Sequence, residues 1–511
     1  MSYTSNTVTT TFRAIVAKSP ESPAIIFDGV TLSFKELDDK SSKVANKLSE
    51  LGFGRGDRVA ILASNHIEYY VCVLGAIKIA ACAVPLPAMM SVETLSAMIL
   101  GSDAKVLFAC ESFYKKAEAA LVLSGSGQVE HKIGFDFIAE GWTNYTECTA
   151  SMCTDDPCIP ILADDEFNII YSSGTTGVPK GIIHTHGFRS GDAEGLRSMG
   201  FAEGKVSIIT TALYSNWSLY AFLAALQSGG GSVIMRKFDL RIFLALCEKL
   251  QPDFVFLVPV LCERLLAAPF FDDYNLGSNT TKWVAGSSFS RDSKMKLLNR
   301  WQGGLTELYG MTEGTPSAML EAHLYPDKLD SVGRPGDSCV LKILDDDGLV
   351  LELGKVGEVA GHSEAMMKGY NQLPEQTQAL EWYDGDGRRY FKSGDLGYID
   401  ADGFLYIVGR KKDMIISGGF NIYPVDLEDM LCRNPNVLEA SVIGIPSKEW
   451  GETPLALIVP TSPEVSPESI CTWANERLGK LQKISKVIVR ASLPRGVNGK
   501  VLKKDLRKEY S

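Results

Sequence analysis

The sequence predicts a multidomain α/β protein, and three observations lead to that fold class. The chain has 511 residues, and a typical domain has roughly 150, so two or more packing units are expected. Short apolar runs alternate with longer helical periods through the first three hundred residues, which predicts layered α/β units with parallel sheets. Farther along the chain, short strand patterns separated by turns predict a smaller β-rich subdomain at about 330–411. An α+β C-terminal domain of about one hundred residues is expected to follow it.

The first part of the chain contains the predicted parallel strands. Residues 11–17 are typical of a first helix. Buried strands, with helical stretches between most of them, are expected at 58–63, 83–86, 105–108, 207–209, 232–235, 254–258 and 282–284.

The second part is divided by turns. Asp345–Gly348 and Asp400–Gly403 are turn sequences between short strands of the β-rich subdomain. After Arg410 the predicted elements are a helix at 426–432, strands at 440–445 and 455–459, a helix at 467–478 and a strand at 486–489.

Composition excludes several classes of protein. With 45% hydrophobic and 22% charged residues the chain can bury an ample core, so wholesale disorder is excluded. A net charge of −11 argues against a nucleic-acid backbone or an anionic membrane as the main partner. The most membrane-like stretch, 71–90, contains Lys78, Pro85 and Pro87, and therefore predicts a helix end and a buried strand, not a transmembrane segment.

Eleven cysteines, without a C-x-x-C pair, predict reduced and mostly buried thiols. The first twenty residues are too poor in basic groups to favour a transit peptide, so the expected location is the cytoplasm.

The strongest local signal is the segment 171–181, which follows an apolar run. It contains four serine and threonine hydroxyls, three glycines and one lysine, and such a loop can surround phosphate oxygens with N–H, O–H and ammonium donors. It is not a Walker loop, because Val178 follows Gly177 where that pattern requires Lys. A flexible surface loop would explain the glycines alone, but neither the preceding strand nor the final Pro-Lys-Gly.

Four later segments are ambiguous when each is taken alone. Thr312 and Glu313 could bind a triphosphate and its Mg²⁺, or begin a helix. Asp395 offers a carboxylate at a turn that could accept ribose hydroxyls, or is an ordinary Asp turn. The charged run before 415–421 could be a solvated loop or a hinge, and Lys500 in a glycine-flanked loop would usually be a surface charge.

Taken in order, these segments resemble the adenylate-forming superfamily, the AMP-binding ligases that include acyl- and aryl-CoA synthetases, over nearly the whole chain. The resemblance implies an N-terminal domain at 1–411 and a mobile C-terminal cap at 412–511, with a hinge at Lys412. It also implies two steps. A carboxylic acid reacts with MgATP to give an acyl-adenylate and pyrophosphate, and CoA then takes the acyl group as a thioester.

The resemblance assigns roles to individual residues. Thr312, Glu313 and Lys500 would be catalytic, with Glu313 also binding Mg²⁺. ATP would be bound by Ser172, Ser173, Gly174, Thr175, Thr176, Gly177, Lys180, Tyr309, Asp395 and Arg410. The hinge and the path of CoA would comprise Lys412, Ser417, Gly418 and Gly419. The acyl pocket would be lined by Tyr214, Ser215, Trp217, Ser287, Gly310, Met311 and Thr315.

The sequence also departs from the family pattern. The aromatic-His pair of many members is replaced by Tyr214 and Ser215, so a histidine gate is not expected, and the family's Gly-Gly-Ala-Pro-like turn here contains Ser287. The Asp expected for an amino acid's ammonium group is missing, which favours an apolar aliphatic or aromatic acid. His184 and His186 have no nearby third ligand, so a structural role is favoured over a metal site.

Three alternatives stay open beside the CoA ligase. The enzyme could load a carrier protein instead of free CoA, it could be a luciferase-like oxygenase, or it could bind nucleotide without catalysis. Its expected partners are ATP, CoA and a small-molecule carboxylic acid, with a homodimer or a carrier protein as possible protein partners.

Overall fold

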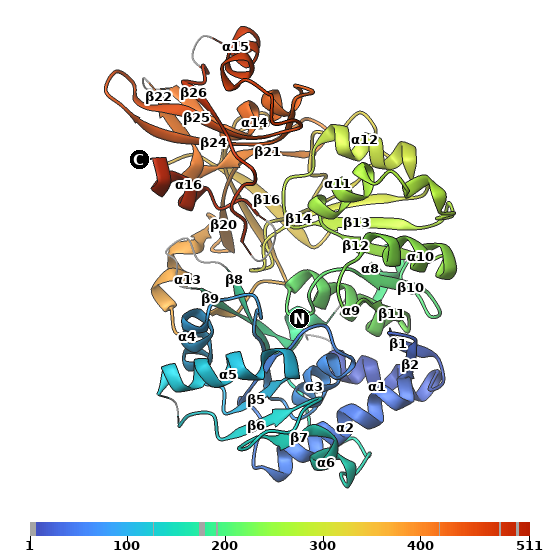
Figure 1. Cartoon of the computed structure of the whole chain (residues 1–511). Helices are drawn as coiled ribbons and strands as arrows, with labels where there is room; N and C mark the ends of the chain where they lie inside the picture. Colours follow the sequence, from blue (N-terminus) through green and yellow to red (C-terminus); the bar gives the residue numbers. More distant parts are fainter. Residues whose placement is uncertain are drawn as a thin grey trace.

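A computed structural model of the protein describes residues 7–125, 127–172, 179–190, 193–417, 420–479, 482–496 and 500–510. Two large sheets and a small β-rich sheet form the body of the molecule. Figure 1 shows the C-terminal strands gathered at one end and the N-terminal helices at the opposite end. The predicted fold class, with a large layered N-terminal domain and an α+β C-terminal domain, is confirmed.

The first sheet has eight strands within the described residues, in the order β15-β14-β13-β12-β10-β11-β1-β2. The six strands from β14 to β1 run parallel, while β2 and β15 are antiparallel edges. The strands are β1 (Pro23–Phe27), β2 (Val30–Ser33), β10 (Val206–Ile209), β11 (Gly231–Ile234), β12 (Phe254–Leu257), β13 (Thr281–Ala285), β14 (Leu305–Gly310) and β15 (Ser317–Glu321).

The second sheet also has eight strands in the described part of the chain, in the order β18-β9-β8-β4-β3-β5-β6-β7. It is parallel from β8 to β7, and β9 and β18 are added antiparallel at one edge. The strands are β3 (Arg58–Leu62), β4 (Cys82–Pro85), β5 (Val106–Ala109), β6 (His131–Gly134), β7 (Thr143–Asn144), β8 (Glu166–Ser172), β9 (Lys180–Thr185) and β18 (Gly369–Tyr370).

Two almost entirely buried helices lie between these sheets. In α3 (Ile67–Lys78) and α9 (Asn216–Ser228) apolar side chains surround the whole helix, as expected for helices packed on every side. Tyr70 of α3 stacks on Phe222 of α9, with 3.9 Å between ring centroids. A Cβ at Gly75 would lie 2.6 Å from the side chain of Val44, so the glycine permits close approach of the neighbouring helix α2 (Phe34–Glu50).

The other helices of this part cover the outer faces of the sheets or connect strands. They are α1 (Val8–Lys18), α4 (Val92–Ser102), α5 (Glu111–Ser124), α6 (Tyr145–Ala150), α7 (His186–Arg189), α8 (Ala193–Ser198), α10 (Leu240–Leu250), α11 (Pro259–Ala267) and α12 (Arg291–Arg300), with a 3₁₀ turn at Phe271–Asp273.

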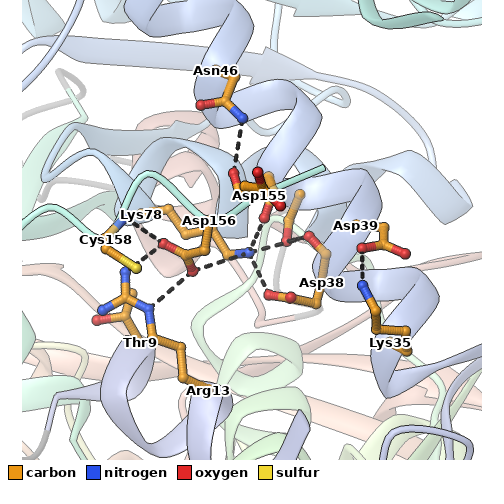
Figure 2. A network of polar contacts seen from close by, with 12 residues as sticks. Thr9, Arg13, Lys35, Asp38, Asp39, Asn46, Lys78, Asp155, Asp156 and Cys158 are labelled. Carbon is orange, nitrogen blue, oxygen red and sulfur yellow. Dashed lines mark hydrogen bonds and ion pairs between the residues drawn. The ribbon is translucent and has the colours of Figure 1, made fainter. Parts of the chain in front are cut away.

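A buried lysine ties three N-terminal helices to the segment that leads into β8. The Lys78 side chain is 1% exposed, and its ammonium donates to Asp38 Oδ1 at 2.6 Å and to Ser42 Oγ at 2.7 Å. Asp156 lies 3.4 Å away and also accepts two hydrogen bonds from Arg13 of α1. Figure 2 shows Lys78 at the centre of this network and the separate pair Lys35–Asp39 at its side.

The β-rich subdomain is a sheet of five described strands, β16 (Cys339–Leu344), β17 (Gly357–Ser363), β19 (Glu381–Tyr383), β20 (Arg389–Ile399) and β21 (Leu405–Arg410), with the helix α13 (Pro374–Leu380) beside it. Consecutive neighbours in this sheet are antiparallel. The predicted β-rich subdomain is therefore present after the layered α/β part of the chain.

The C-terminal part begins with a 3₁₀ turn at Lys411–Asp413. Its described elements are β22 (Ile415–Ser417), β23 (Phe420–Ile422), α14 (Pro424–Cys432), β24 (Val437–Ser447), β25 (Gly451–Pro460), α15 (Pro467–Arg477), β26 (Lys486–Val489) and α16 (Lys503–Tyr510). The strands β24 and β25 are longer than the predicted 440–445 and 455–459, because their hairpin ladder continues past the apolar residues to the pair Ser447–Gly451.

All eleven cysteines are unpaired, and six of them are buried, which confirms the predicted free thiols. In the part of the chain that the structure describes, no helix has the length and apolar character needed to cross a membrane.

Candidate active site

The predicted acyl-pocket residues follow the carboxyl ends of neighbouring parallel strands. Tyr214 to Trp217 follow β10, Ser287 follows β13, and Met311 follows β14, and these strands share one sheet. Ligands of open α/β sheets bind at this edge. Thr315 is the exception, because it is fully buried with its hydroxyl 3.7 Å from the Cys339 sulfur of β16.

Trp217 is fixed at this edge by a hydrogen bond and a ring stack. Its Nε1 donates to the carbonyl oxygen of Leu257, the last residue of β12, at 3.0 Å. Its indole stacks on Tyr220, with 5.6 Å between centroids and 3° between planes. Ser215 is the N-cap of α9, and its hydroxyl accepts from the Ser218 N–H at 3.2 Å. Burial raises the pKa of Tyr214, which keeps this phenol neutral.

A cluster of three polar side chains joins the end of β14 to the β-rich subdomain. Asp395 lies directly opposite Arg410 across β20 and β21, with 2.6 Å between Oδ1 and Nε. The Tyr309 hydroxyl donates to Asp395 Oδ2 at 2.8 Å. Burial raises the pKa of Asp395, while Arg410 and Tyr309 oppose the rise. The side chain of Asp395 is 7% exposed and that of Arg410 is 43% exposed, so the guanidinium is more accessible than the carboxylate.

The predicted turn at Asp395 is wrong, because this residue lies within the long strand β20. The register slips between β17 and β20 at this point, and Gly394 has φ +70°, so the backbone bulges instead of turning. The bulge occupies the sequence Ser-Gly-Asp, which accounts for its turn-like composition.

The loop after β14 is fixed by close backbone packing. Gly314 has φ +103°, and a Cβ there would lie 1.9 Å from the Ala365 carbonyl oxygen. The Met367 N–H donates to the Glu313 carbonyl oxygen at 2.9 Å. Thr312 and Glu313 lie in a turn between two strands, so the alternative that they begin a helix is wrong.

Tyr370 brings the two ends of the predicted phosphate site together. Its hydroxyl donates to Glu313 Oε1 at 2.6 Å, and the ammonium of Lys180 lies 4.7 Å from the centroid of its ring. Burial, with Glu313 as a further cause, raises the pKa of this phenol. Tyr370 belongs to β18 and lies in no recognisable motif, so the sequence alone does not mark it as a site residue.

The ends of the predicted phosphate cradle close as a hairpin. Ser172, the last residue of β8, lies opposite Lys180, the first residue of β9. Ser173, Gly174, Thr175, Thr176 and Gly177 lie outside the described residues.

Lys500 of the C-terminal part faces the residues of the N-terminal part. Its electrostatic neighbours are Arg410, Asp395, Glu313 and Lys412. Lys500 is exposed as a residue, but loss of solvent around its ammonium lowers its pKa most, Arg410 lowers it further, and the two carboxylates oppose the change. A lysine near the end of the chain therefore lies among charges that come from the loop after β14 and from β20 and β21.

The predicted hinge is held by ion pairs. Lys411 Nζ lies 3.1 Å from Glu358 of β17 and 3.0 Å from Asp346. Lys412 follows in the 3₁₀ turn, and its pKa is lowered chiefly by burial. Lys412 is exposed as a residue, so a solvated loop and a hinge both stay compatible with this run. Ser417 ends β22, while Gly418 and Gly419 lie outside the described residues.

The two-part α/β fold, with a lysine of the smaller part near the carboxylates Asp395 and Glu313 of the larger one, is the arrangement expected of an adenylate-forming enzyme. The chain belongs to the AMP-binding enzyme family, whose sequence model matches residues 12–371. The model of the AMP-binding enzyme C-terminal domain matches residues 426–500. The protein is thus an AMP-forming ligase of the acyl-CoA synthetase type.

Several curated proteins are similar over nearly their full length. Long-chain-fatty-acid–CoA ligase FadD13 of Mycobacterium tuberculosis is 29% identical, over 94% of each chain. A 2-succinylbenzoate–CoA ligase of Oceanobacillus iheyensis is 30% identical, over 96% of this chain and 97% of the relative. Fatty acid–[acyl-carrier-protein] ligase ScoC of Streptomyces coeruleorubidus is 28% identical, over 98% of this chain and 96% of the relative.

The fold is also that of a solved structure with nucleotide bound. ATP-bound MatB from Rhodopseudomonas palustris superposes with a TM-score of 0.87 at 26% identity, over 99% of each chain.

Proposed function

We propose that this enzyme is a carboxylic acid–CoA ligase that adenylates an apolar acid and then forms its CoA thioester. The observation that supports this most directly is the position of Lys500 among Asp395, Glu313 and Arg410. A positive charge there would stabilise the negative charge that accumulates when the acid carboxylate attacks the α-phosphate of ATP.

The nucleotide residues keep the roles assigned from the family resemblance. Ser172, Lys180 and the cradle 173–177 would hold the β- and γ-phosphates, and Thr312 would hold the α-phosphate. Asp395 and Arg410 would bind the ribose hydroxyls beside Tyr309. The hydrogen bond from Tyr309 and the ion pair with Arg410 keep the Asp395 carboxylate oriented for this purpose.

Glu313 has the chemistry required for Mg²⁺. No group of three or more His, Cys, Asp or Glu residues suited to a metal ion occurs among the described residues. Mg²⁺ is commonly held by one or two carboxylates together with substrate phosphates, so the single carboxylate of Glu313 fits this arrangement. When bound, the ion would neutralise phosphate charge, while Tyr370 keeps the Glu313 carboxylate in place.

The second half-reaction would require the C-terminal domain, 412–511, to rotate about Lys412 relative to residues 1–411. Lys500 would leave the site, and Ser417, Gly418 and Gly419 would border the path of the pantetheine arm. Eleven unpaired cysteines fit a reducing compartment, so a cytoplasmic location belongs to the same proposal.

The proposed acid is apolar, aliphatic or aromatic. Tyr214, Trp217 and Met311 at the strand ends offer aromatic and thioether surface, which suits apolar groups. The names of FadD13 and the 2-succinylbenzoate–CoA ligase include both a long aliphatic acid and an aromatic one, which supports the same range.

The experiment is to measure pyrophosphate release with MgATP across aromatic, medium-chain and long-chain acids, and to detect the CoA thioester by mass spectrometry. Lys500→Ala should cripple adenylation and leave thioester formation from preformed acyl-adenylate comparatively intact. Equal loss of both half-reactions would contradict the role of Lys500, and pyrophosphate release with none of the acids would contradict the proposed function.

A second candidate function is the loading of a carrier protein, and similarity to ScoC supports it. The first half-reaction would be the same, with a phosphopantetheine thiol in place of free CoA. Parallel reactions with free CoA and with a phosphopantetheinylated carrier protein would separate the two by which thioester forms.

A further inference from the structure

A buried cluster of polar side chains lies beneath the loop that follows β14. His184 of β9 and Asn168 of β8 face each other across the two strands, and both are fully buried. Arg189, at the end of α7, is 7% exposed and reaches both of them. The cluster contacts the proposed nucleotide loop on one side and the first residue of α9 on the other.

The hydrogen bonds define the orientation of each side chain. Arg189 Nε lies 2.8 Å from Asn168 Oδ1, and because a guanidinium can only donate, this atom must be the amide oxygen. The amide nitrogen of Asn168 therefore faces His184 Nδ1 at 3.0 Å. Arg189 Nη2 lies 2.8 Å from the same Nδ1. With two donors directed at it, Nδ1 accepts and carries no proton.

The proton of neutral His184 is thus on Nε2, which donates to the carbonyl oxygen of Thr312 at 2.7 Å. Burial, and then the charge of Arg189, lower the pKa of His184 well below its usual value. A protonated imidazole would place an N–H against both donors at Nδ1, so geometry and charge both favour the neutral ring.

No described carboxylate pairs with Arg189, whose charge is compensated only by neutral acceptors. Its second bond from Nη2 goes to Asn216 Oδ1 at 2.8 Å, and burial lowers its pKa to about 9. The buried hydroxyl of Tyr70 is the titratable group with an electrostatic effect on it. A guanidinium held in this way remains charged at neutral pH and keeps His184 in one tautomer.

The contact with Thr312 fixes the direction of a peptide group. In a trans peptide the carbonyl oxygen of Thr312 and the N–H of Glu313 point in opposite directions. Holding that oxygen on His184 therefore turns the Glu313 N–H away from the cluster. The ring of Phe188, whose centroid lies 4.1 Å from that of His184, packs beneath Gly314 in the same loop.

We infer that His184 is a positioning residue for adenylation. As a neutral donor oriented by Arg189, it holds the Thr312 peptide in place. Because Arg189 also binds Asn216 at the start of α9, the same cluster connects the nucleotide loop to the proposed acyl pocket. This inference rests on the proposed role of Thr312 at the α-phosphate. The histidine itself transfers no proton and touches no substrate.

The first test needs no substrate. In protein labelled with ¹⁵N at histidine, with signals assigned by His184→Gln, the His184 ring should show the Nε2–H tautomer and no titration between pH 5.5 and 9. An Nδ1–H tautomer or a titration within this range would overturn the inference.

The second test compares His184→Leu with His184→Gln in MgATP binding by calorimetry and in pyrophosphate release. Leucine cannot donate to Thr312, so the ratio kcat/KM for ATP should fall about 10- to 100-fold, as for a small misplacement of a reacting group. Glutamine can donate to Thr312 and accept from Arg189, so it should restore activity to within a few-fold, with an unchanged pH–rate profile.

His186→Gln is the matched control, because His186 is equally buried two residues away and neither ring nitrogen has a partner among the described residues. Its ATP kinetics should be unchanged, and its melting temperature will show how far a loss of stability alone affects those kinetics. Losses at His184 that merely follow the melting temperature, for leucine and glutamine alike, would overturn the inference. If the wild type itself binds no MgATP, the proposed function fails, while the tautomer measurement still decides the orientation of His184.

Discussion

The hydroxyl of Tyr370 donates to the carboxylate of Glu313 at 2.6 Å across a separation of 57 residues. Tyr370 belongs to β18 at the edge of the second sheet, whereas Glu313 follows the last parallel strand of the first. Because Lys180 lies over the same ring, one aromatic side chain sets the distance between the proposed Mg²⁺ ligand and the proposed phosphate ligand.

Tyr370→Phe should weaken the use of Mg²⁺ more than the use of ATP. The variant keeps the ring beneath Lys180 and loses only the hydrogen bond that orients Glu313. A hydrogen bond to a charged group contributes about 1.5–3 kcal/mol, so the Mg²⁺ concentration for half-maximal pyrophosphate release should rise by about 10- to 150-fold. Titration of Mg²⁺ after removal of metal with EDTA measures this.

Tyr383→Phe is the control for that substitution. Tyr383 donates to Glu381 at 3.0 Å, but the pair is exposed on the β-rich subdomain. Its Mg²⁺ dependence should match that of the wild type. An unchanged Mg²⁺ curve for Tyr370→Phe would refute the orienting role.

Sequence patterns predicted the parallel strands because buried strands are continuous apolar runs with clear boundaries, as at 254–258 for β12. They failed at Asp395 because a glycine-containing bulge and a turn use the same residues. The glycine at position 394 indicates a positive φ there. Only the pairing with β17 on both sides of the bulge shows that the chain continues as one strand.

The remaining site residues could not be predicted, because their roles depend on contacts between distant segments. Arg189 in isolation resembles a surface charge, and only the packing of α7 beneath the β14 loop buries it beside His184. Tyr370 is likewise defined by the pairing of β18 with β9. No local pattern encodes such pairings.

Trp217→Ala should change which acids are accepted. The indole is fixed by its bond to the Leu257 carbonyl oxygen and by its stack on Tyr220, so its removal opens the strand-end wall without an obvious replacement. Pocket contacts of one methylene change selectivity by about 10- to 200-fold, and the ratio of kcat/KM between bulky and short acids should rise at least tenfold on that scale. Trp217→Phe keeps a ring at this position and should change the ratio less. A uniform loss with all acids would contradict a wall function.

Lys282→Met should remove a pH dependence of stability. Lys282 is fully buried on β13 and donates to the carbonyl oxygens of Trp301 at 2.9 Å and Gln302 at 2.8 Å. Burial lowers its pKa to about 7, whereas in the unfolded chain the value is about 10.4. Between these values the unfolded state binds more protons, so the free energy of unfolding should rise with pH from 7 towards 10.

Methionine does not titrate, so the pH curve of the variant should lack this rise. Thermal midpoints of both proteins from pH 6.5 to 9.5, at constant ionic strength, should diverge in favour of the wild type as the pH increases. Parallel curves would show that Lys282 keeps its proton in the folded state.

Lys78→Met should destabilise the N-terminal part far more than Lys35→Met. The two lysines belong to the network and the neighbouring pair shown in Figure 2, and both pair with aspartates of α2. Lys78 is 1% exposed, so its loss leaves Asp38 and Asp156 close together with only Arg13 to compensate their charge. Removing one partner of a buried ion pair costs about 3–5 kcal/mol, whereas an exposed pair such as Lys35–Asp39 contributes about 0–1 kcal/mol.

At a fixed heating rate, the Lys78 variant should melt several degrees lower and the Lys35 variant within about one degree of the wild type. Adding Asp156→Asn to Lys78→Met should recover part of the loss, because it removes one of the two uncompensated carboxylates. A further loss would mean that the packing of the lysine stem, and not its charge, holds the three helices to the segment before β8.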